Sequence, residues 1–202
     1  MNRVPKTEQE RVVGILRSGG IGVLPTDTIY GIMGSALNPK TVRRIYRLRR
    51  RNPKKPMIIL IGSMSDIRQF GVHLAPATKK ILKQAWPGKV SVILGIKNRE
   101  SRSRLNYLHR GTNALAFRLP KPKWLRDLLQ KTGSLVAPSA NPEGKPPAKT
   151  IREAKKYFGR RADFYINAGR LDSPPSTLIA IEKGKVKVLR PGAVSLSFRK
   201  IM

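Results

Sequence analysis

Three polar segments carry the residue types that could do chemistry in this chain. They are residues 25–31 (PTDTIYG), 49–56 (RRRNPKKP) and 138–149 (PSANPEGKPPAK). The first and third offer short hydroxyl and amide side chains, which donate and accept hydrogen bonds, whereas the cationic groups of the second bind anions. Each segment alone is also typical of an ordinary turn, since Asp, Ser, Asn, Pro and Gly are common in turns. Together they predict a site for a ligand that carries phosphate.

The sequence leaves most of the phosphate binding to Arg and Lys, because it has no glycine-rich loop of the Walker or dinucleotide-binding type. It contains 42 Lys and Arg against 11 Asp and Glu, a formal net charge of +31. This excess favours an anionic partner such as nucleic acid, nucleotide or a membrane surface, although a solubility effect is the plainer interpretation. The absence of cysteine excludes disulfides and thiolate chemistry, and only His73 and His109 could supply imidazole to a metal.

Length and composition favour one folded domain. A chain of 202 residues, 40% of them hydrophobic, can bury a real core, so we expect a single domain over residues 1–202. No apolar run approaches the roughly 20 residues that span a bilayer, and the charged N-terminal stretch does not have the form of a signal peptide. We therefore expect a soluble, cytoplasmic protein without a membrane partner.

The hydrophobic pattern supplies the elements that must position the polar segments. Apolar runs typical of strands alternate with helical spacing, which predicts an α/β domain with a mixed sheet. The polar segments then follow or flank strands, where ligands collect in open α/β sheets. The expected strands are 21–24, 57–61, 90–96, 114–119, 135–137, 164–167, 177–181 and 185–189, with a turn at Lys183-Gly184. The expected helices are 7–18, 39–50, 63–70, 76–85, one after Pro122, and 150–158, with capping boxes from Thr7 and Thr150 and a further cap at Ser63 and Asp66.

Together these segments resemble the YrdC-like threonylcarbamoyl-AMP synthase family. The resemblance runs from about Val13 to Val194 and rests on PTDTIYG, IYRLRRRNPKKPM, WPGKVSVIL, LAFRLP, PSAN, SPPSTLIAI and VLRPG, which occur in the family's order. One such motif is a weak signal, and seven in order are a specific one. The resemblance implies a YrdC-like fold, a twisted mixed β-sheet with flanking helices around a basic groove. It also implies the short, single-domain form, without the additional C-terminal domain of longer relatives.

The activity that the resemblance implies is that of a nucleotidyltransferase, an L-threonylcarbamoyladenylate synthase. Such enzymes join L-threonine, bicarbonate and ATP, which brings Mg²⁺ with it, and release pyrophosphate. Other proteins then transfer the threonylcarbamoyl group to adenosine 37 of tRNAs that read codons beginning with A. Since N-carboxylated threonine supplies the attacking oxygen, no protein nucleophile is needed, and catalysis would consist of positioning and charge stabilisation.

The resemblance also implies roles for individual residues. Arg49 and Arg51 correspond to the family's K-x-R pair, and Ser139 and Asn141 to its S-x-N pair, and these four are the expected catalytic residues. The expected ATP-binding residues are Arg49, Arg51, Asn141, Lys149 and Arg190. The expected threonine-binding residues are Thr26, Arg118, Ser139 and Ser176, with no metal ligand among the protein side chains. Arg118 suits a carboxylate, because a guanidinium can bind one with two hydrogen bonds.

This sequence departs from the family pattern at three positions. Arg49 replaces the usual Lys, Asn52 replaces a Pro after the second basic residue, and Lys89 replaces the Pro after WPG. A compact ammonium and a broad guanidinium fork are not equivalent at a close phosphate contact. If Arg49 nevertheless occupies the Lys site, the Arg49→Lys variant should retain or improve activity.

Several residues have simpler interpretations. Tyr30 could form a wall of the pocket or belong to the core, Trp86 is expected in the core, and both histidines are expected to be structural or exposed. Arg43, Arg44 and Arg47 are expected on a solvated helix face.

Two alternative functions use the charge without chemistry. One is an RNA-binding protein of the same fold that takes tRNA or double-stranded RNA, and the other is a basic ribosome-associated domain. Aromatic residues make up only 6% of the chain and form no stripe of the kind that stacks unpaired bases. A ribosome-associated domain would also leave the PTDT and PSAN segments without a role. The synthase interpretation is therefore the leading one.

Overall fold

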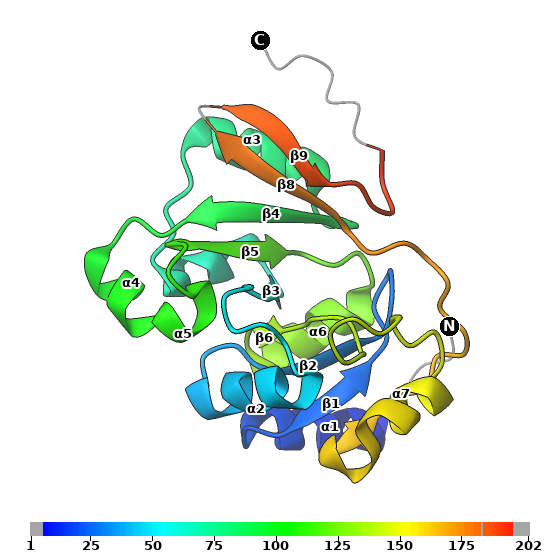
Figure 1. Cartoon of the computed structure of the whole chain (residues 1–202). Helices are drawn as coiled ribbons and strands as arrows, with labels where there is room; N and C mark the ends of the chain where they lie inside the picture. Colours follow the sequence, from blue (N-terminus) through cyan, green and yellow to red (C-terminus); the bar gives the residue numbers. More distant parts are fainter. Residues whose placement is uncertain (1–5, 183, 196–202) are drawn as a thin grey trace.

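The sheet is mixed and follows the order β7-β1-β2-β6-β3-β5-β4-β8-β9 in this computed structural model, which describes residues 6–182 and 184–195 (Figure 1). Three neighbouring pairs are parallel, namely β1 with β7, β3 with β5 and β4 with β8, and the others are antiparallel. The strands are β1 (Ile21–Leu24), β2 (Gly31–Ser35), β3 (Ile58–Leu60), β4 (Val90–Gly95), β5 (Ala114–Arg118), β6 (Leu135–Val136), β7 (Phe164–Tyr165), β8 (Thr177–Glu182) and β9 (Lys185–Arg190). The mixed sheet predicted from the sequence is confirmed, and Lys183 of the predicted turn lies outside the described residues.

The helices begin close to the capping signals. Ser63 and Asp66 form the predicted capping box, and the Thr150 side chain accepts a hydrogen bond from the Glu153 amide. The first helix begins at Lys6, one residue before the predicted cap at Thr7. The α-helices are α1 (Lys6–Arg17), α2 (Pro39–Arg49), α3 (Pro76–Ala85), α4 (Arg99–Arg104), α5 (Asn106–His109), α6 (Lys123–Thr132) and α7 (Ile151–Phe158), and the 3₁₀ helices are η1 (Met64–Phe70) and η2 (Gly159–Arg161).

Four elements were not predicted from the sequence, namely β2, α4, α5 and the short 3₁₀ helix η2 that directly follows α7. The first three lack the pattern that would reveal them. Strand β2 reads GIMGS, and its two glycines are unfavourable in an isolated strand, but it lies between β1 and β6 and pairs with both. Helix α4 buries none of its residues and so has no apolar periodicity, and α5 is only one turn long. Tertiary pairing and the Asn98 cap determine these elements.

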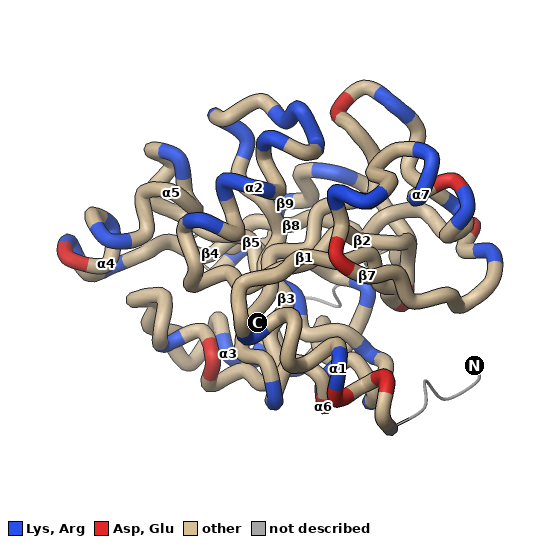
Figure 2. The backbone as a smooth tube through the Cα atoms, turned by 90° about the horizontal axis from the view of Figure 1, so that it is seen from below, with Lys and Arg blue, Asp and Glu red and all other residues tan. Residues whose placement is uncertain are grey.

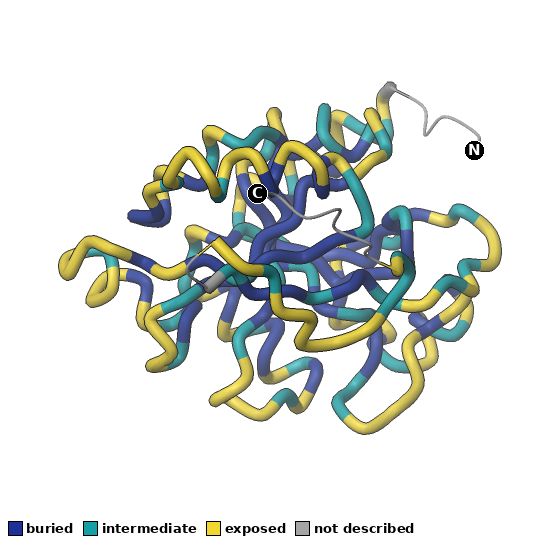
Figure 3. The backbone as a smooth tube through the Cα atoms, turned by 90° about the horizontal axis from the view of Figure 1, so that it is seen from above, coloured by how far each residue is buried: buried dark blue, intermediate teal, exposed yellow. Residues whose placement is uncertain are grey.

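Alternating side chains divide the core between the two faces of the sheet. Val23 and Ile32 pack with α2 and α7 on one face, and their neighbours Leu24 and Met33 pack with α1 and α6 on the other. In Figure 3 the strands form the buried centre, and the exposed backbone is concentrated on the surrounding helices and loops. Because helices cover both faces of the sheet, a ligand can reach the strands only at a part of the sheet that no helix covers.

Positive charge is spread around the molecule rather than confined to one surface. Figure 2 shows Lys and Arg on helices at every side of the sheet, with few acidic residues among them. Within residues 6–182 and 184–195, no helix is both long enough and apolar enough to cross a membrane.

Candidate active site

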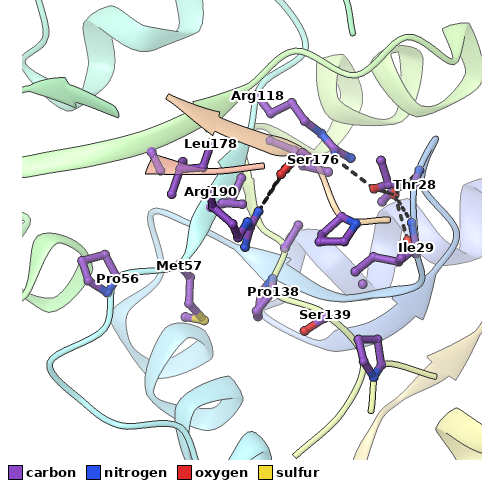
Figure 4. A pocket seen from close by; sticks show the side chains of 18 of the residues that line it. Thr28, Ile29, Pro56, Met57, Arg118, Pro138, Ser139, Ser176, Leu178 and Arg190 are labelled. Carbon is purple, nitrogen blue, oxygen red and sulfur yellow. Dashed lines mark hydrogen bonds between the residues drawn. The ribbon is translucent and has the colours of Figure 1, made fainter. Parts of the chain in front are cut away.

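A cavity of about 490 Å³ lies against the sheet (Figure 4). It adjoins the cluster of core residues that contains Leu24, Met33 and the buried side chains of α1 and α6. Leu60 belongs both to that cluster and to the cavity wall. The volume lies within the range of small-molecule sites. The polar and charged lining residues are Thr26, Thr28, Arg49, Arg51, Thr112, Arg118, Ser139, Ser176 and Arg190.

The floor of the cavity is apolar and is built by strand alternation. Ala116 of β5 pairs with Ile58 of β3 on one side and with Ile93 of β4 on the other, and all three line the cavity. Ala114 and Leu178 extend this surface toward β8. Small and branched side chains in one row give a flat, dry floor on which a ring or an aliphatic group can pack.

Four guanidinium groups surround this floor, from Arg49, Arg51, Arg118 and Arg190. Burial, and to a smaller extent the positive charge of Arg51, lower the pKa of Arg49 to about 10. The pKa values of Arg118 and Arg190 are also lowered, first by burial and then by a neighbouring cation, Arg190 for Arg118 and Arg51 for Arg190. Because no carboxylate is among the lining residues, the cavity holds an excess of positive charge that an anionic ligand would neutralise.

The Arg49 side chain connects the end of α2 to the PSAN segment. Its Nε donates to the Asn141 carbonyl at 2.9 Å, and its Nη2 donates to Ser139 Oγ at 3.1 Å and to Asn141 Oδ1 at 3.4 Å. Its main-chain carbonyl accepts from the Glu143 amide at 2.7 Å. Nη1 is buried and has no hydrogen-bond partner among residues 6–182 and 184–195, so this donor is unsatisfied there.

A left-handed residue directs Arg49 and Arg51 to the same cavity. Arg50 has φ of 48° and ψ of 36°, and the Arg50 and Arg51 amides donate to the carbonyls of Arg47 and Tyr46, as in a Schellman motif. The chain therefore reverses after α2 instead of continuing the helix. The Arg51 Nε and Nη2 atoms then donate to the carbonyls of Lys55 and Pro56 at 3.0 and 2.8 Å.

The PSAN segment is held by β2. Ser139 forms a bridge with Gly31, the Ile32 amide donates to the Pro138 carbonyl at 3.0 Å, and the Ala140 amide donates to the Tyr30 carbonyl at 2.9 Å. Ser139 Oγ accepts a hydrogen bond from Arg49, so its own proton is available to a ligand in the cavity.

The PTDT segment directly follows β1 and lines another part of the cavity. Thr26 Oγ1 accepts from the amides of Thr28 and Ile29, which forms a side-chain turn after the strand. Thr28 Oγ1 accepts from Arg118 Nη1 at 3.1 Å, and Asp27 Oδ1 accepts from Arg118 Nη2 at 2.9 Å. Arg118 Nε is buried without a partner in the described chain.

Ser176 and Arg190 close the cavity on the β8–β9 side. Arg190 Nη2 donates to the Ser176 carbonyl at 2.8 Å, and the hydroxyls of Ser176 and Ser91 lie 2.8 Å apart. Figure 4 shows Arg190 and Arg118 on either side of Ser176. These contacts fix Arg190 in the cavity wall.

Seven residues predicted for the site line the cavity, but two do not. Asn141 lies behind the wall, where its Oδ1 faces Arg49 and its Nδ2 donates to the carbonyls of Pro142 and Lys145. Lys149 is exposed and forms an ion pair with Asp172. The seven lining residues are Thr26, Arg49, Arg51, Arg118, Ser139, Ser176 and Arg190.

Thr28 and Thr112 also line the cavity, although the family resemblance assigned a role to neither. Thr28 had a signal in the sequence, because it follows Thr26 by two residues in the same loop. Thr112 had none, since its place depends on the turn after α5, where its Oγ1 donates to the His109 carbonyl.

The simpler interpretations mostly hold. Tyr30 is a core residue that donates its hydroxyl proton to the Gly169 carbonyl, and Trp86 is a core residue whose Nε1 donates to the Val90 carbonyl. His109 is buried with hydrogen bonds, and His73 is exposed. On α2, Arg43 and Arg47 are exposed, as predicted, and Arg44 is half-exposed and paired with Asp163.

No group of three or more His, Asp or Glu able to hold a metal ion occurs among residues 6–182 and 184–195. The cavity offers hydroxyl oxygens but no anionic oxygen. A divalent cation in this site would therefore take its charged ligands from a bound phosphate compound.

The fold and the site together define an α/β protein with a cationic cavity for small anionic compounds. The chain belongs to the Sua5/YciO/YrdC family, because the sequence model of that family, described as "Telomere recombination", matches residues 14–192. The family resemblance drawn from the motifs is thereby confirmed.

Relatives of known name cover most of this chain. A threonylcarbamoyl-AMP synthase of Thiobacillus denitrificans is 30% identical over 174 residues, which are 85% of this chain and 89% of the relative. The threonylcarbamoyl-AMP synthase of Bacillus subtilis is 28% identical over 187 residues, 92% of this chain and 53% of the relative. Sua5 of Pyrococcus abyssi, solved as a complex with L-threonine, has a TM-score of 0.84 at 24% identity and matches 95% of this chain and 56% of that one. This chain thus spans about half the length of the last two.

Proposed function

We propose that this chain is an L-threonylcarbamoyladenylate synthase, a nucleotidyltransferase that makes threonylcarbamoyl-AMP from L-threonine, bicarbonate and ATP and releases pyrophosphate. The observation that carries the proposal is the meeting of four guanidinium groups and several small hydroxyls in one cavity with an apolar floor. Relatives named threonylcarbamoyl-AMP synthase support it, and one of them is matched over 89% of its length.

The phosphate groups of ATP bind between Arg49, Arg51 and Arg190 in this proposal. These three side chains come from α2, the turn after it and β9, and the positive charge of Arg51 lowers the pKa of the other two. A triphosphate brings about four negative charges, which neutralise this excess. At this end of the cavity, neither Arg49 Nη1 nor the Ser139 hydroxyl proton has an acceptor among the residues that the structure describes.

Threonine binds at the other end, with its carboxylate on Arg118. Nε of that side chain has no partner among the residues described, and Nη1 and Nη2 each use one proton for Thr28 and Asp27. A guanidinium carries five N–H groups, so enough remain for two hydrogen bonds to a carboxylate. Thr26 and Ser176 line the wall beside it.

The chemical step needs positioning and charge stabilisation. A carbamate oxygen of N-carboxylated threonine forms a bond to the α-phosphorus of ATP, and the bond from that phosphorus to the bridging oxygen breaks, so that pyrophosphate leaves with the electron pair. Arg49, Arg51 and Ser139 stabilise the charge that develops on the phosphoryl oxygens. Asn141 acts through Arg49, since it holds that side chain from behind the wall.

Mg²⁺ enters this proposal as the companion of ATP. Since the lining residues include no carboxylate, the phosphate oxygens and water would be its ligands. The ion supplies neutralisation of phosphate charge when it is bound. Lys149 lies outside the cavity wall, and its contact with ATP would require its ion pair with Asp172 to open.

Further partners also belong to the proposal. The product would pass to proteins that transfer the threonylcarbamoyl group to tRNA, in the cytoplasm. The net charge of +31 supports contact with tRNA or double-stranded RNA. An RNA-binding role without synthesis explains the charge equally well, but it gives no use to the enclosed Arg118 and Ser176.

Pyrophosphate release tests the proposal. With ATP, Mg²⁺ and bicarbonate, the protein should release pyrophosphate only when L-threonine is added. The Ser139→Ala variant should lower the rate at least about tenfold, because it removes a donor to the phosphoryl group. Ser103→Ala, an exposed serine of α4, is the matched control and should leave the rate unchanged. Threonine-independent release, or none at all, would contradict the synthase assignment.

A further inference from the structure

Arg118 and Asp27 form an ion pair that differs from the others in the structure. Their side chains are 5% and 7% exposed, whereas every other ion pair among residues 6–182 and 184–195 has a partner at least 39% exposed. The distance from Arg118 Nη2 to Asp27 Oδ1 is 2.9 Å. A pair removed from water to this degree is weakly screened, so its charges act strongly on whatever binds next to them.

The two partners lie at different depths. Arg118 lines the cavity, whereas Asp27 is not among the lining residues. Asp27 Oδ2 accepts a hydrogen bond from the Lys121 amide at 3.3 Å, which ties the carboxylate to the segment after β5. Asp27 therefore holds Arg118 from behind without contacting a ligand in the cavity.

Without a ligand, Asp27 is the compensating charge for a buried cation. Burial lowers the pKa of Arg118, the positive charge of Arg190 lowers it further, and Asp27 acts in the opposite direction. When a substrate carboxylate binds in front, the same guanidinium serves two anions, and these repel each other.

We propose that Asp27 is a positioning residue that sets the affinity of the site for the amino-acid carboxylate, through the orientation and the charge of Arg118. This rests on the proposed function, which places L-threonine at Arg118. The two contributions have opposite signs. Asp27 fixes the guanidinium plane, which favours binding, and its negative charge weakens the attraction of Arg118 for the substrate carboxylate.

Two substitutions separate these contributions. Asp27→Asn keeps an oxygen acceptor for Arg118 Nη2 and removes the charge, so it should lower the Kd of L-threonine by about three- to tenfold. Asp27→Glu keeps the charge but moves the acceptor by one methylene, so it should raise that Kd by about threefold or more. Titration calorimetry measures both, and the Kd of ATP should change less than the Kd of L-threonine, because Asp27 is bonded to Arg118 and not to an arginine assigned to the phosphates.

Two controls make the readout specific to the carboxylate. L-threoninol lacks that group, so Asp27→Asn should not tighten its binding. Asp163→Asn removes another carboxylate, which is paired with Arg44. Asp163 lies at the start of β1, at the opposite end from Asp27, so this variant should leave threonine binding unchanged. A merely structural role for Asp27 would change the affinities for L-threonine, L-threoninol and ATP alike.

The outcomes are distinct. A folded Asp27→Asn protein with unchanged or weaker threonine binding would overturn the inference, as would equal tightening of L-threoninol. If Asp27→Asn does not fold, the Asp27→Glu variant, which retains the buried charge, decides alone, and an unchanged Kd for L-threonine in it refutes the positioning role. If the wild-type protein binds no L-threonine, the proposed function and this inference are both refuted. If the wild type binds L-threonine and the Asp27 variants bind it with the same Kd, only the inference is refuted.

Discussion

Arg49 is more constrained than the family pattern indicates. The sequence led us to expect that Arg49→Lys would retain activity, because Lys is usual at this position. In the structure, Nε donates to the Asn141 carbonyl and Nη2 to the Ser139 hydroxyl, while Nη1 has no partner within the described part of the chain. An ammonium is a single point of donation and cannot reproduce this fork. The local contacts therefore reverse the expectation.

Arg49→Lys should lower the rate of pyrophosphate release by about tenfold or more, because Ser139 loses its partner and the PSAN segment its anchor. Steady-state kinetics with varied ATP would measure this change. Arg47→Lys, on the exposed face of the same helix, is the control and should be neutral. Full activity in Arg49→Lys would show that the contacts between Arg49 and the PSAN segment are dispensable.

At the residue scale, the motifs identified most of the residues that line the cavity, but they did not show which motif residues lie outside its wall. The family motif assigned Ser139 and Asn141 to the site together, yet only Ser139 lines the cavity. Asn141 instead accepts from Arg49 and donates to the carbonyls of Pro142 and Lys145. Lys149 was assigned to ATP from the family resemblance, whereas in the structure it forms an ion pair with Asp172, which is distant in sequence. Contacts of that kind arise from tertiary packing and leave no local signal.

At the scale of elements, the end of α2 is the decisive feature of the site. Arg50 adopts the left-handed conformation that favours glycine, and this turn brings Arg51 back to the cavity. The conformation costs a non-glycine residue about 1 kcal/mol. The chain keeps this cost where the turn directs two guanidinium groups to one ligand.

Arg50→Gly should raise the free energy of unfolding by about 0.5 kcal/mol, since relief of the left-handed strain exceeds the entropy lost by glycine on folding. Chemical denaturation would measure it. Arg47→Gly, in the interior of the same helix, should instead lower the free energy of unfolding by about 1 kcal/mol. A loss of stability in Arg50→Gly would show that the Arg50 side chain contributes more than its backbone costs.

Asp163 connects three elements. Its carboxylate accepts from both terminal nitrogens of Arg44 on α2 and from the Ile21 amide of β1. The hydrogen bonds from Arg44 hold the pKa of Asp163 below the usual 3.8, against the opposing effect of partial burial. A lowered pKa means that the native state binds the proton less tightly than the unfolded chain.

This contribution to stability is present above about pH 4 and is lost as the pH falls through the pKa of the folded state. Asp163→Asn should therefore lower the free energy of unfolding by about 1 kcal/mol at pH 7 and by progressively less toward pH 3. Thermal unfolding across this range would measure the difference. An equal deficit at pH 7 and at pH 3 would exclude the charge as its source.

The sequence predicted the elements that have local signals and missed those that depend on neighbours. Capping residues and proline at the first turn identified α2, α3 and α7, and continuous apolar runs identified β3 and β8. The glycine-rich β2 became visible only through its pairing with β1 and β6. Since β2 holds the PSAN segment, one of the elements that position the site had no signal in the sequence.

At the scale of the whole molecule, the sheet gathers segments from both halves of the chain. The loop after β1, the turn after α2, the end of β5, the PSAN segment and the β8–β9 pair meet at one cavity. The motifs indicated what each segment could bind, and the strand order explains why they meet. The charge spread over the rest of the surface is a separate property, which an RNA contact would use (Figure 2).

The most direct test of the central claim is to detect the product that needs all three substrates in one cavity. We would incubate the protein with ATP, Mg²⁺, L-threonine and ¹³C-bicarbonate and analyse the mixture by mass spectrometry. The account predicts threonylcarbamoyl-AMP carrying the ¹³C label, absent when any one substrate is omitted and strongly reduced in Arg51→Gln but not in Arg43→Gln. Conversion of ATP without a labelled adenylate, or equal product from both variants, would contradict it.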